Sequence, residues 1–227
     1  MENQSNKVVL FSEKINEELL GITNDLMYFA LEQYENEIMP ELELFFDQFP
    51  LTEEEKGYYY PYYFWWKVFC SRSTITNNKT IYQMFLHKNR FKFKKKNQLM
   101  RTLLQWQYVI PSYFYIEKKA SQRVFGLFDI FDYRDYKVVI VPQETFTHPA
   151  SNDVLAGMVL PLADGGYFSV IDFFIIPEKI RAPLISKLIS FYQSNSTIST
   201  GEFFSRHYPL MLKMTIDHLM ENNMKVH

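Results

Sequence analysis

The stretch KGYYYPYYFWWKVF, residues 56–69, constrains the fold most, because eight aromatic residues fall within nine positions around one proline. Just before it, Thr52 and Glu55 have the spacing of a capping box, which predicts that a helix begins there. Such a helix is apolar around most of its circumference, and helices of that kind are normally buried centrally. We therefore predict that Trp65 and Trp66 are buried and that the aromatic run is structural.

The alternative for the same run is a partly exposed stacking platform. Five of its aromatic residues are tyrosines, and each hydroxyl needs a hydrogen-bond partner if its ring is buried. Pro61 cannot donate the backbone hydrogen bond of an interior helical position, so we expect the helix to kink or restart there.

Charge is distributed unevenly along the sequence, although the net charge is only −2. Residues 1–56 contain fourteen acids and three bases, whereas residues 57–116 contain ten bases and neither aspartate nor glutamate. Such asymmetry is typical of a chain that has an anionic partner. The alternative is internal, with the acidic first segment lying against the basic second one.

The composition argues against several classes of site. The single cysteine, Cys70, excludes an intramolecular disulfide and a cysteine-rich zinc site, and its aromatic neighbours indicate a small buried apolar residue. Seven glycines are few for a glycine-rich phosphate loop. The sequence contains neither a signal-peptide core nor an apolar stretch long enough to cross a membrane, so we expect a cytoplasmic protein. We predict no cofactor and no metal.

Helical periodicity dominates the first half of the chain. Apolar residues recur every three or four positions from Ile15 to Phe29, and Ser12 is expected to cap that helix. Pro40 is expected to separate a second, short acidic helix, ELELFFDQF (residues 41–49). Further helices are predicted over about residues 79–89 and in NQLMRTLLQWQ (residues 97–107).

The periodicity changes beyond Pro111. Short runs rich in β-branched and aromatic residues follow one another: YFYIE (113–117), RVFGLFDIF (123–131), YKVVIV (136–141), VLAGMVLPL (154–162) and GYFSVIDFFII (166–176). ADGG, between the last two runs, is a strong hairpin signal, and the loop FTHPASND (146–153) interrupts the sheet. We predict a small, mainly antiparallel sheet or a partly closed barrel over about residues 112–176.

Two helices are expected after Pro177. One covers residues 182–192, and the last begins at a capping box of Ser199 and Glu202 and runs towards Asn222, with a kink at Pro209. The predicted fold class is therefore α+β. A helical region over residues 1–110, a small β region over 111–177 and C-terminal helices over 178–227 are expected to pack as one or two compact units.

The stretch from the aromatic helix through PLADGGYFSVIDFFIIPE (161–178) resembles the region that accompanies SEC-C motifs in certain bacterial proteins. In those proteins a helical part with an aromatic segment leads into strands similar to VFGLFDIFDYRDYKVVIV (124–141) and NDVLAGMVLPLADGGYFSVIDFFIIPE (152–178). The resemblance covers about residues 58–180 and implies a related fold in a bacterial protein. The cysteine-rich zinc-binding tail is missing, so the resemblance implies neither the nucleic-acid nor the chaperone-adaptor role linked to that tail.

The strongest functional candidate is the basic segment HKNRFKFKKKNQLMR, residues 87–101. Lysine and arginine neutralise phosphates, and aromatic faces stack on unpaired bases. Alternation over residues 90–94 would place Phe91 and Phe93 on one side of an extended segment, either for stacking or as anchors of a solvated basic loop. An acidic surface, of this chain or of a partner, is a third alternative. The predicted binding residues are Lys88, Arg90, Lys92, Lys94, Lys95, Lys96 and Arg101.

Catalytic patterns are sparse. The histidines His87, His148, His207, His218 and His227 do not have the spacing of metal ligands. His148 shares a loop with Ser151 and Asp153, which are the residue types of a catalytic triad, although a proline-containing turn explains them equally. Asp129, Asp132 and Asp135 fit a turn between strands better than a cation site.

The sequence therefore favours a non-catalytic, cytoplasmic interaction or adaptor module whose partner is another protein and not a membrane. Nucleic-acid binding through the basic segment is the first alternative. A hydrolase-like enzyme centred on His148 and Asp153 is the second. The biochemical activity and the oligomeric state stay open.

Overall fold

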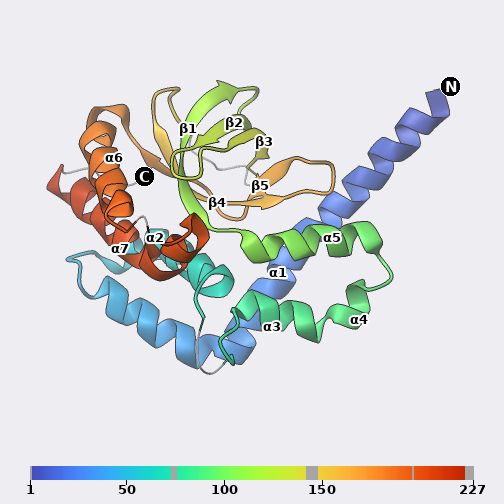
Figure 1. Cartoon of the computed structure of the whole chain (residues 1–227), viewed down its shortest axis with the longest axis horizontal. Coiled ribbons are helices and arrows are strands. Elements are labelled where there is room, and N and C mark those ends of the chain that lie inside the picture. Colours follow the sequence, from blue (N-terminus) through green and yellow to red (C-terminus); the bar gives the residue numbers. More distant parts are fainter. Residues whose placement is uncertain (1, 73–75, 142–147, 196, 223–227) are drawn as a thin grey trace.

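The computed structural model describes residues 2–72, 76–141, 148–195 and 197–222, with side chains from Lys14 onwards. Helices come first: α1 (Glu2–Phe46), α2 (Glu53–Phe69), α3 (Ile81–Lys88), α4 (Arg90–Phe93), α5 (Asn97–Gln105) and the 3₁₀ turn η1 (Trp106–Tyr108). The strands are β1 (Pro111–Lys119), β2 (Val124–Asp129), β3 (Asp135–Ile140), β4 (Val154–Pro161), β5 (Tyr167–Ser169) and β6 (Phe174–Ile176). Two helices, α6 (Glu178–Gln193) and α7 (Thr200–Glu221), complete the chain (Figure 1). The predicted α+β class is confirmed.

Five of the strands close into a small barrel. Their order is β1-β2-β3-β5-β4, and β1 also pairs with β4, which closes the ring. Within the ring only β3 and β5 run parallel. The predicted run 166–176 divides into two strands, because β4 pairs first with β6, at Ala156 and Phe174, and farther along with β5, at Val159 and Ser169. The predicted small, mainly antiparallel β region is thus confirmed, and it forms a closed barrel with β6 as an additional strand outside the ring.

Strand β4 is buried on both faces, which explains why its sequence shows no alternation of apolar and polar residues. Leu155 and Val159 belong to a cluster that fills the barrel together with Phe114 and Phe125. Alternate β4 residues, such as Met158, belong instead to a larger core that the barrel shares with the helices. The interior of the five-stranded barrel is therefore filled with side chains, and its outer surface packs into the core that the helices form.

The ADGG hairpin forms as predicted between β4 and β5. The amide of Leu162 donates to the carbonyl of Gly166 at 2.8 Å, and the carboxylate of Asp164 accepts from the amide of Gly166 at 3.0 Å. Gly165 has a φ of 87°, a backbone conformation that glycine adopts without steric cost.

The aromatic run is structural, as predicted. Trp65 and Trp66 are only 6% and 7% exposed. The Trp66 indole donates to the carbonyl of Phe204 in α7 at 3.0 Å, and the Tyr62 hydroxyl donates to the carbonyl of Asp172, between β5 and β6, at 3.0 Å. Helix α2 therefore packs centrally, with polar ring atoms bonded to two other parts of the fold.

Prolines do not end the helices that contain them. Helix α2 continues through Pro61, and α1 continues through Pro40, so the predicted separate helix over residues 41–49 is wrong. Burial of Ile38, Leu42 and Phe46 holds α1 against the core on both sides of Pro40, which outweighs one lost hydrogen bond. The predicted cap at Ser12 is also wrong, because α1 already begins at Glu2.

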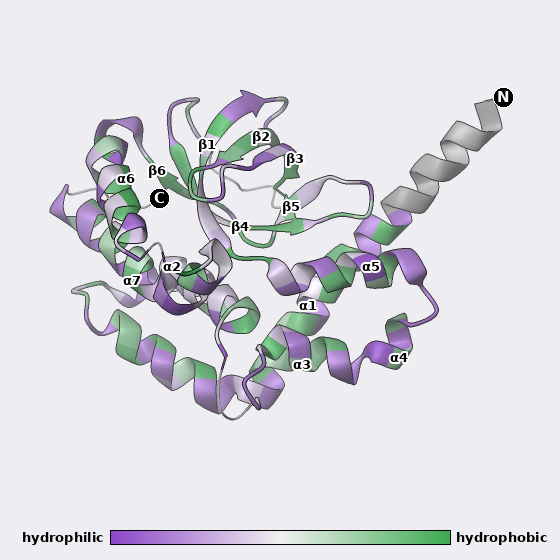
Figure 2. Ribbon diagram, in the orientation of Figure 1, coloured by the Kyte–Doolittle hydropathy of each residue, from purple (hydrophilic) through white to green (hydrophobic). Residues whose placement is uncertain are grey.

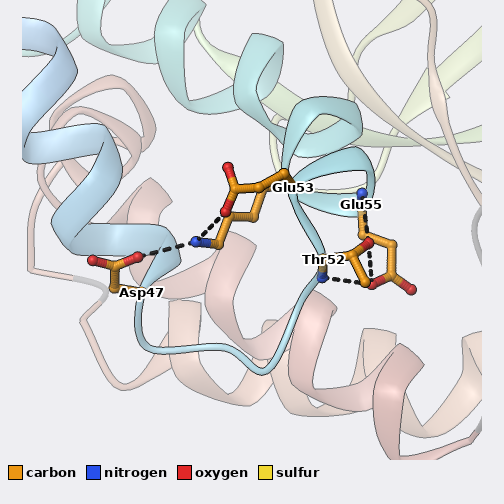
Figure 3. Close-up of polar contacts among 5 residues, drawn as sticks. Asp47, Thr52, Glu53 and Glu55 are labelled. Carbon is orange, nitrogen blue, oxygen red and sulfur yellow. Dashed lines mark hydrogen bonds and ion pairs between the residues drawn. The ribbon is translucent and has the colours of Figure 1, made fainter.

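Helix α2 begins at the predicted capping box. Thr52 Oγ1 accepts from the amide of Glu55 at 3.3 Å, and Glu55 Oε2 accepts from the amide of Thr52 at 2.8 Å (Figure 3). Lys56 Nζ pairs with Asp47 at 3.0 Å and with Glu53 at 2.9 Å, which links the end of α1 to the start of α2. Only half of the second predicted box forms: Ser199 Oγ accepts from the amide of Glu202, whose carboxylate pairs with Arg206.

None of the helices within the described ranges is long and apolar enough to span a lipid bilayer.

Replacing Trp65 with alanine should lower the free energy of unfolding by about 3–5 kcal/mol, because the ring leaves a cavity in the core. Leu44→Ala is the control, since Leu44 is 72% exposed on α1 and should change stability by at most about 0.5 kcal/mol. Urea denaturation followed by tryptophan fluorescence and circular dichroism measures both. Equal midpoints for wild type and Trp65→Ala would contradict a core role.

Gly157 in β4 should not tolerate alanine, because an added Cβ would lie 2.8 Å from Cδ1 of Phe173. We expect a loss of about 1–3 kcal/mol from this overpacking. Gly21→Ala on α1 is the matched control: nothing lies within 4 Å of its added Cβ, and alanine should stabilise the helix by about 0.5–1 kcal/mol. Thermal unfolding of the two variants should shift in opposite directions, and shifts of the same sign would refute the packing argument.

Candidate anion-binding face

The basic segment folds into three short helical pieces at one corner of the molecule. Helix α3 begins at a capping box in which Thr80 Oγ1 accepts from the amide of Gln83 at 3.1 Å. Asn89 ends α3, with its side-chain amide donating to the carbonyl of Phe85 at 3.0 Å, and α4 follows immediately. Figure 2 shows α4 and the turn that leads to α5 mainly in the hydrophilic colour.

The predicted extended alternation over residues 90–94 is wrong. The amide of Lys94 donates to the carbonyl of Arg90 at 3.0 Å, so these residues form a helical turn. Residues two apart lie on the same side of a strand but on different sides of a helix. As a result Phe91 is 85% exposed, whereas Phe93 is fully buried against the core. One ring anchors the segment and the other faces solvent.

All seven predicted binding residues are exposed. Two of them pair with acids of α1: Lys92 Nζ lies 3.0 Å from Asp25 Oδ2, and Lys96 pairs with Glu18. Glu18 and Asp25 are seven residues apart, about two helical turns, and therefore project from one face of α1. The internal alternative, in which the acidic segment covers the basic one, thus holds for Lys92 and Lys96.

The remaining cations are not neutralised in this way. Among the side chains described from Lys14 onwards, no carboxylate forms an ion pair with Lys88, Arg90, Lys94, Lys95 or Arg101. The Lys88 ammonium group instead lies 5.1 Å from the centre of the Phe29 ring. The exposed cations on either side of Phe91 in the sequence therefore form a patch that α1 neutralises only in part.

Two further cations, which the sequence reasoning missed, extend this patch. A cavity of about 600 Å³ lies between the turn ahead of α3, α3 itself and α5. Its polar lining consists of Arg72, Asn78, Lys79, Gln83, His87, Arg90 and Gln107. No acidic residue is among the described residues that line it. Arg72 and Lys79 lie outside the basic segment. The sequence feature that could have pointed to them is the absence of acids over residues 57–116, a range that contains both. The five cations Arg72, Lys79, Arg90, Lys94 and Lys95 are called the basic face below.

This cavity opens into a longer groove. A second cavity, of about 860 Å³, shares Arg72, Asn78, Gln83 and Gln107 with the first. A third, of about 430 Å³, shares Tyr108, Val109, Ile110 and Gly201 with the second and reaches the barrel at Arg134, Tyr136 and Tyr167. The three adjoining cavities are here called the groove, which extends from α3 and α5 past η1 to the start of α7 and the barrel.

Cys70 lines the groove as a buried thiol. Its Sγ donates to the carbonyl of Val109 at 3.5 Å. Burial raises the pKa of the Cys70 thiol far above its usual range, because a thiolate would lose its hydration. The thiol therefore stays protonated near neutral pH, which fits the predicted role as a small buried apolar residue.

Ser151 of the hydrolase hypothesis lies in a turn that Asp153 closes. The Asp153 carboxylate accepts from the amide of Ala150 at 2.8 Å and from the amide of Glu178 at 3.1 Å, so it orients the loop and the start of α6. Within the described part of the chain, no hydrogen bond joins His148, Ser151 and Asp153, and none of the three lines the groove. Residues 146–147 of this loop and His227 lie outside the described residues.

Asp129, the last residue of β2, has a structural role, as the turn interpretation predicts. Asp129 Oδ1 accepts from Ser112 Oγ at 2.8 Å and from the amides of Phe131 and Asp132 at 2.9 Å each. Burial raises the pKa of the Asp129 carboxyl and outweighs the lowering effect of these hydrogen bonds. Over the described ranges, no group of three or more His, Cys, Asp or Glu side chains is placed to hold a metal ion.

Comparisons of the chain with known protein families, with curated proteins and with solved structures found no match. The resemblance to the region that accompanies SEC-C motifs therefore stays a prediction, and the functional argument rests on the geometry of the basic face and the groove.

Freeing Lys92 and Lys96 should strengthen polyanion binding. We expect the double variant Glu18→Gln and Asp25→Asn to elute from a heparin column at higher salt than wild type, while the free energy of unfolding changes by at most about 1 kcal/mol per exposed pair. Glu32→Gln with Glu35→Gln is the matched control, because both acids are exposed on α1 and the net charge changes equally. If both double variants shift elution equally, the change in net charge explains the effect and the freeing of Lys92 and Lys96 does not.

Proposed function

We propose that this chain is a non-catalytic binding module that holds an anionic macromolecule against its basic face. One observation carries the proposal. Arg72, Lys79 and Arg90 line one cavity, and Lys94 and Lys95 follow Arg90 just after α4. All five are exposed and have no described carboxylate partner, on a chain whose net charge is −2. Like charges that gather in this way repel one another, and a polyanion relieves the repulsion while releasing counterions into solution.

The first candidate partner is an acidic segment of another protein, as an interaction or adaptor module would require. Helix α1 supports it, because two of its acids already meet Lys92 and Lys96 across the surface. An acidic helix of a partner, with acids two turns apart as Glu18 and Asp25 are on α1, could pair in the same way with Arg90, Lys94 and Lys95. The second candidate is nucleic acid, which the exposed Phe91 ring beside these cations favours.

The cytoplasm is the location that fits this proposal. Nucleic acids and acidic protein segments are both abundant there, and the one cysteine is a buried thiol, which suits a reducing compartment.

Neutralising the basic face tests the proposal. We compare the triple variant Arg90→Gln, Lys94→Gln, Lys95→Gln with a control of equal charge, Lys118→Gln, Lys119→Gln, Lys137→Gln, on exposed barrel positions. The probes are single-stranded DNA, duplex DNA, heparin and poly-L-glutamate, each titrated over a range of salt concentrations. Wild type and control should bind at least one probe in a salt-dependent way.

The site variant should lose most of this binding. On a nucleic acid, its slope of log affinity against log salt should be shallower by about 2–3, because each neutralised phosphate contributes about 0.7–0.9. Absence of binding to all four probes at low salt, or equal losses in the two triple variants, would refute the proposed function.

A further inference from the structure

Exposed aromatic rings accompany the cations at two places. Phe91 in α4 is flanked in sequence by Arg90 and Lys92, and Tyr108 in η1 lines the groove; each side chain is 85% exposed. An acidic protein segment would need the cations but no flat apolar surface. Unpaired nucleobases need both, because their faces stack on aromatic rings while their phosphates pair with cations.

The groove leads from Arg90, the sequence neighbour of Phe91, to Tyr108. It begins at Arg72, Lys79 and Arg90, and Tyr108 stands where the 860 Å³ cavity meets the 430 Å³ cavity. An extended polyanion that leaves the basic face along this path must pass the Tyr108 ring. A DNA or RNA duplex keeps its bases stacked within the helix, so it could not offer a base face to that ring.

The last cavity has the lining of a site for a polar ring. Tyr108, Tyr136 and Tyr167 contribute aromatic surface, and Arg134 and Asp132, paired at 2.9 Å, contribute donors and an acceptor. Its volume of about 430 Å³ falls within the range of small-ligand sites. A single nucleotide could enter it with its base stacked on tyrosine and its polar edge towards Arg134 and Asp132.

From these features we infer that the anionic partner is a single-stranded nucleic acid. Its phosphates lie along the basic face, and its unpaired bases stack on Phe91 and on Tyr108 in the groove. This inference rests on the proposed function and selects the second of its two candidate partners, because an acidic protein segment would not need the two exposed rings.

The test uses the full chain and a fluorescein-labelled oligothymidylate of about 16 nucleotides, the upper end of the site size of small single-strand-binding modules. Tyr108→Ala and Phe91→Ala should each weaken binding by about fivefold or more, the loss expected from one base stack. Neither variant should change the slope against salt, because neither removes a charge. Tyr108→Phe should bind like wild type, since it keeps the ring.

Leu44→Ala serves as the control for the loss of an exposed apolar side chain outside the groove. The thermal midpoints of all variants should match that of wild type, which separates loss of binding from loss of fold. The same titrations are repeated with a duplex of equal length and with poly-L-glutamate.

Two outcomes would overturn the inference and leave the proposed function intact. One is duplex or poly-L-glutamate binding as tight as single-strand binding, which would assign a duplex or an acidic protein as the partner. The other is unchanged single-strand affinity in both alanine variants. Failure of wild type to bind any of the three probes at low salt would refute the inference and the proposed function together.

Discussion

The rest of the fold depends on the burial of the aromatic helix α2. Its rings pack against α1, α7 and the outer wall of the barrel. The Trp66 indole bonds to a backbone carbonyl of α7, and the Tyr62 hydroxyl bonds to one in the loop between β5 and β6. The end of α2 is fixed as well, because Ser205 Oγ in α7 donates to the carbonyl of Cys70 at 2.6 Å. This contact sets one wall of the groove, so a core requirement also shapes the proposed binding surface.

The acids of α1 form ion pairs with a buried lysine and with exposed ones. Lys67 of α2 is buried, and its ammonium group pairs with Glu41 at 2.7 Å and with Glu37 at 3.4 Å. Breaking such a buried pair is costly, because one charge would be left without a partner. Nearer the N-terminus, Glu18 and Asp25 meet exposed lysines, where ion pairs contribute little. The acidic segment is therefore bound firmly to α2 and only loosely to the basic face.

Local chemistry made part of the structure predictable. The capping box at Thr52, the ADGG turn and the burial of Trp65 each follow from a few adjacent residues, whose preferences the tertiary structure did not override. The errors arose where packing decided the outcome. Helix α1 passes through Pro40 because the core holds both sides of it, and the helical turn of α4 separates Phe91 from Phe93. Arg72 and Lys79 lie outside the basic segment in the sequence, and folding places them with Arg90 around one cavity.

Charge and stacking have different consequences at this surface. Salt weakens phosphate contacts with the basic face, and it weakens the exposed pairs of α1 with Lys92 and Lys96 at the same time. Those pairs therefore compete with a polyanion for Lys92 and Lys96. A change in salt concentration cannot switch binding on, because it weakens both kinds of contact. Stacking on Phe91 and Tyr108 involves no counterion release, so it persists at salt concentrations where the charges contribute little. Selectivity for unpaired bases would therefore lie in the two exposed rings, while the cations determine how strongly and how fast any polyanion is attracted.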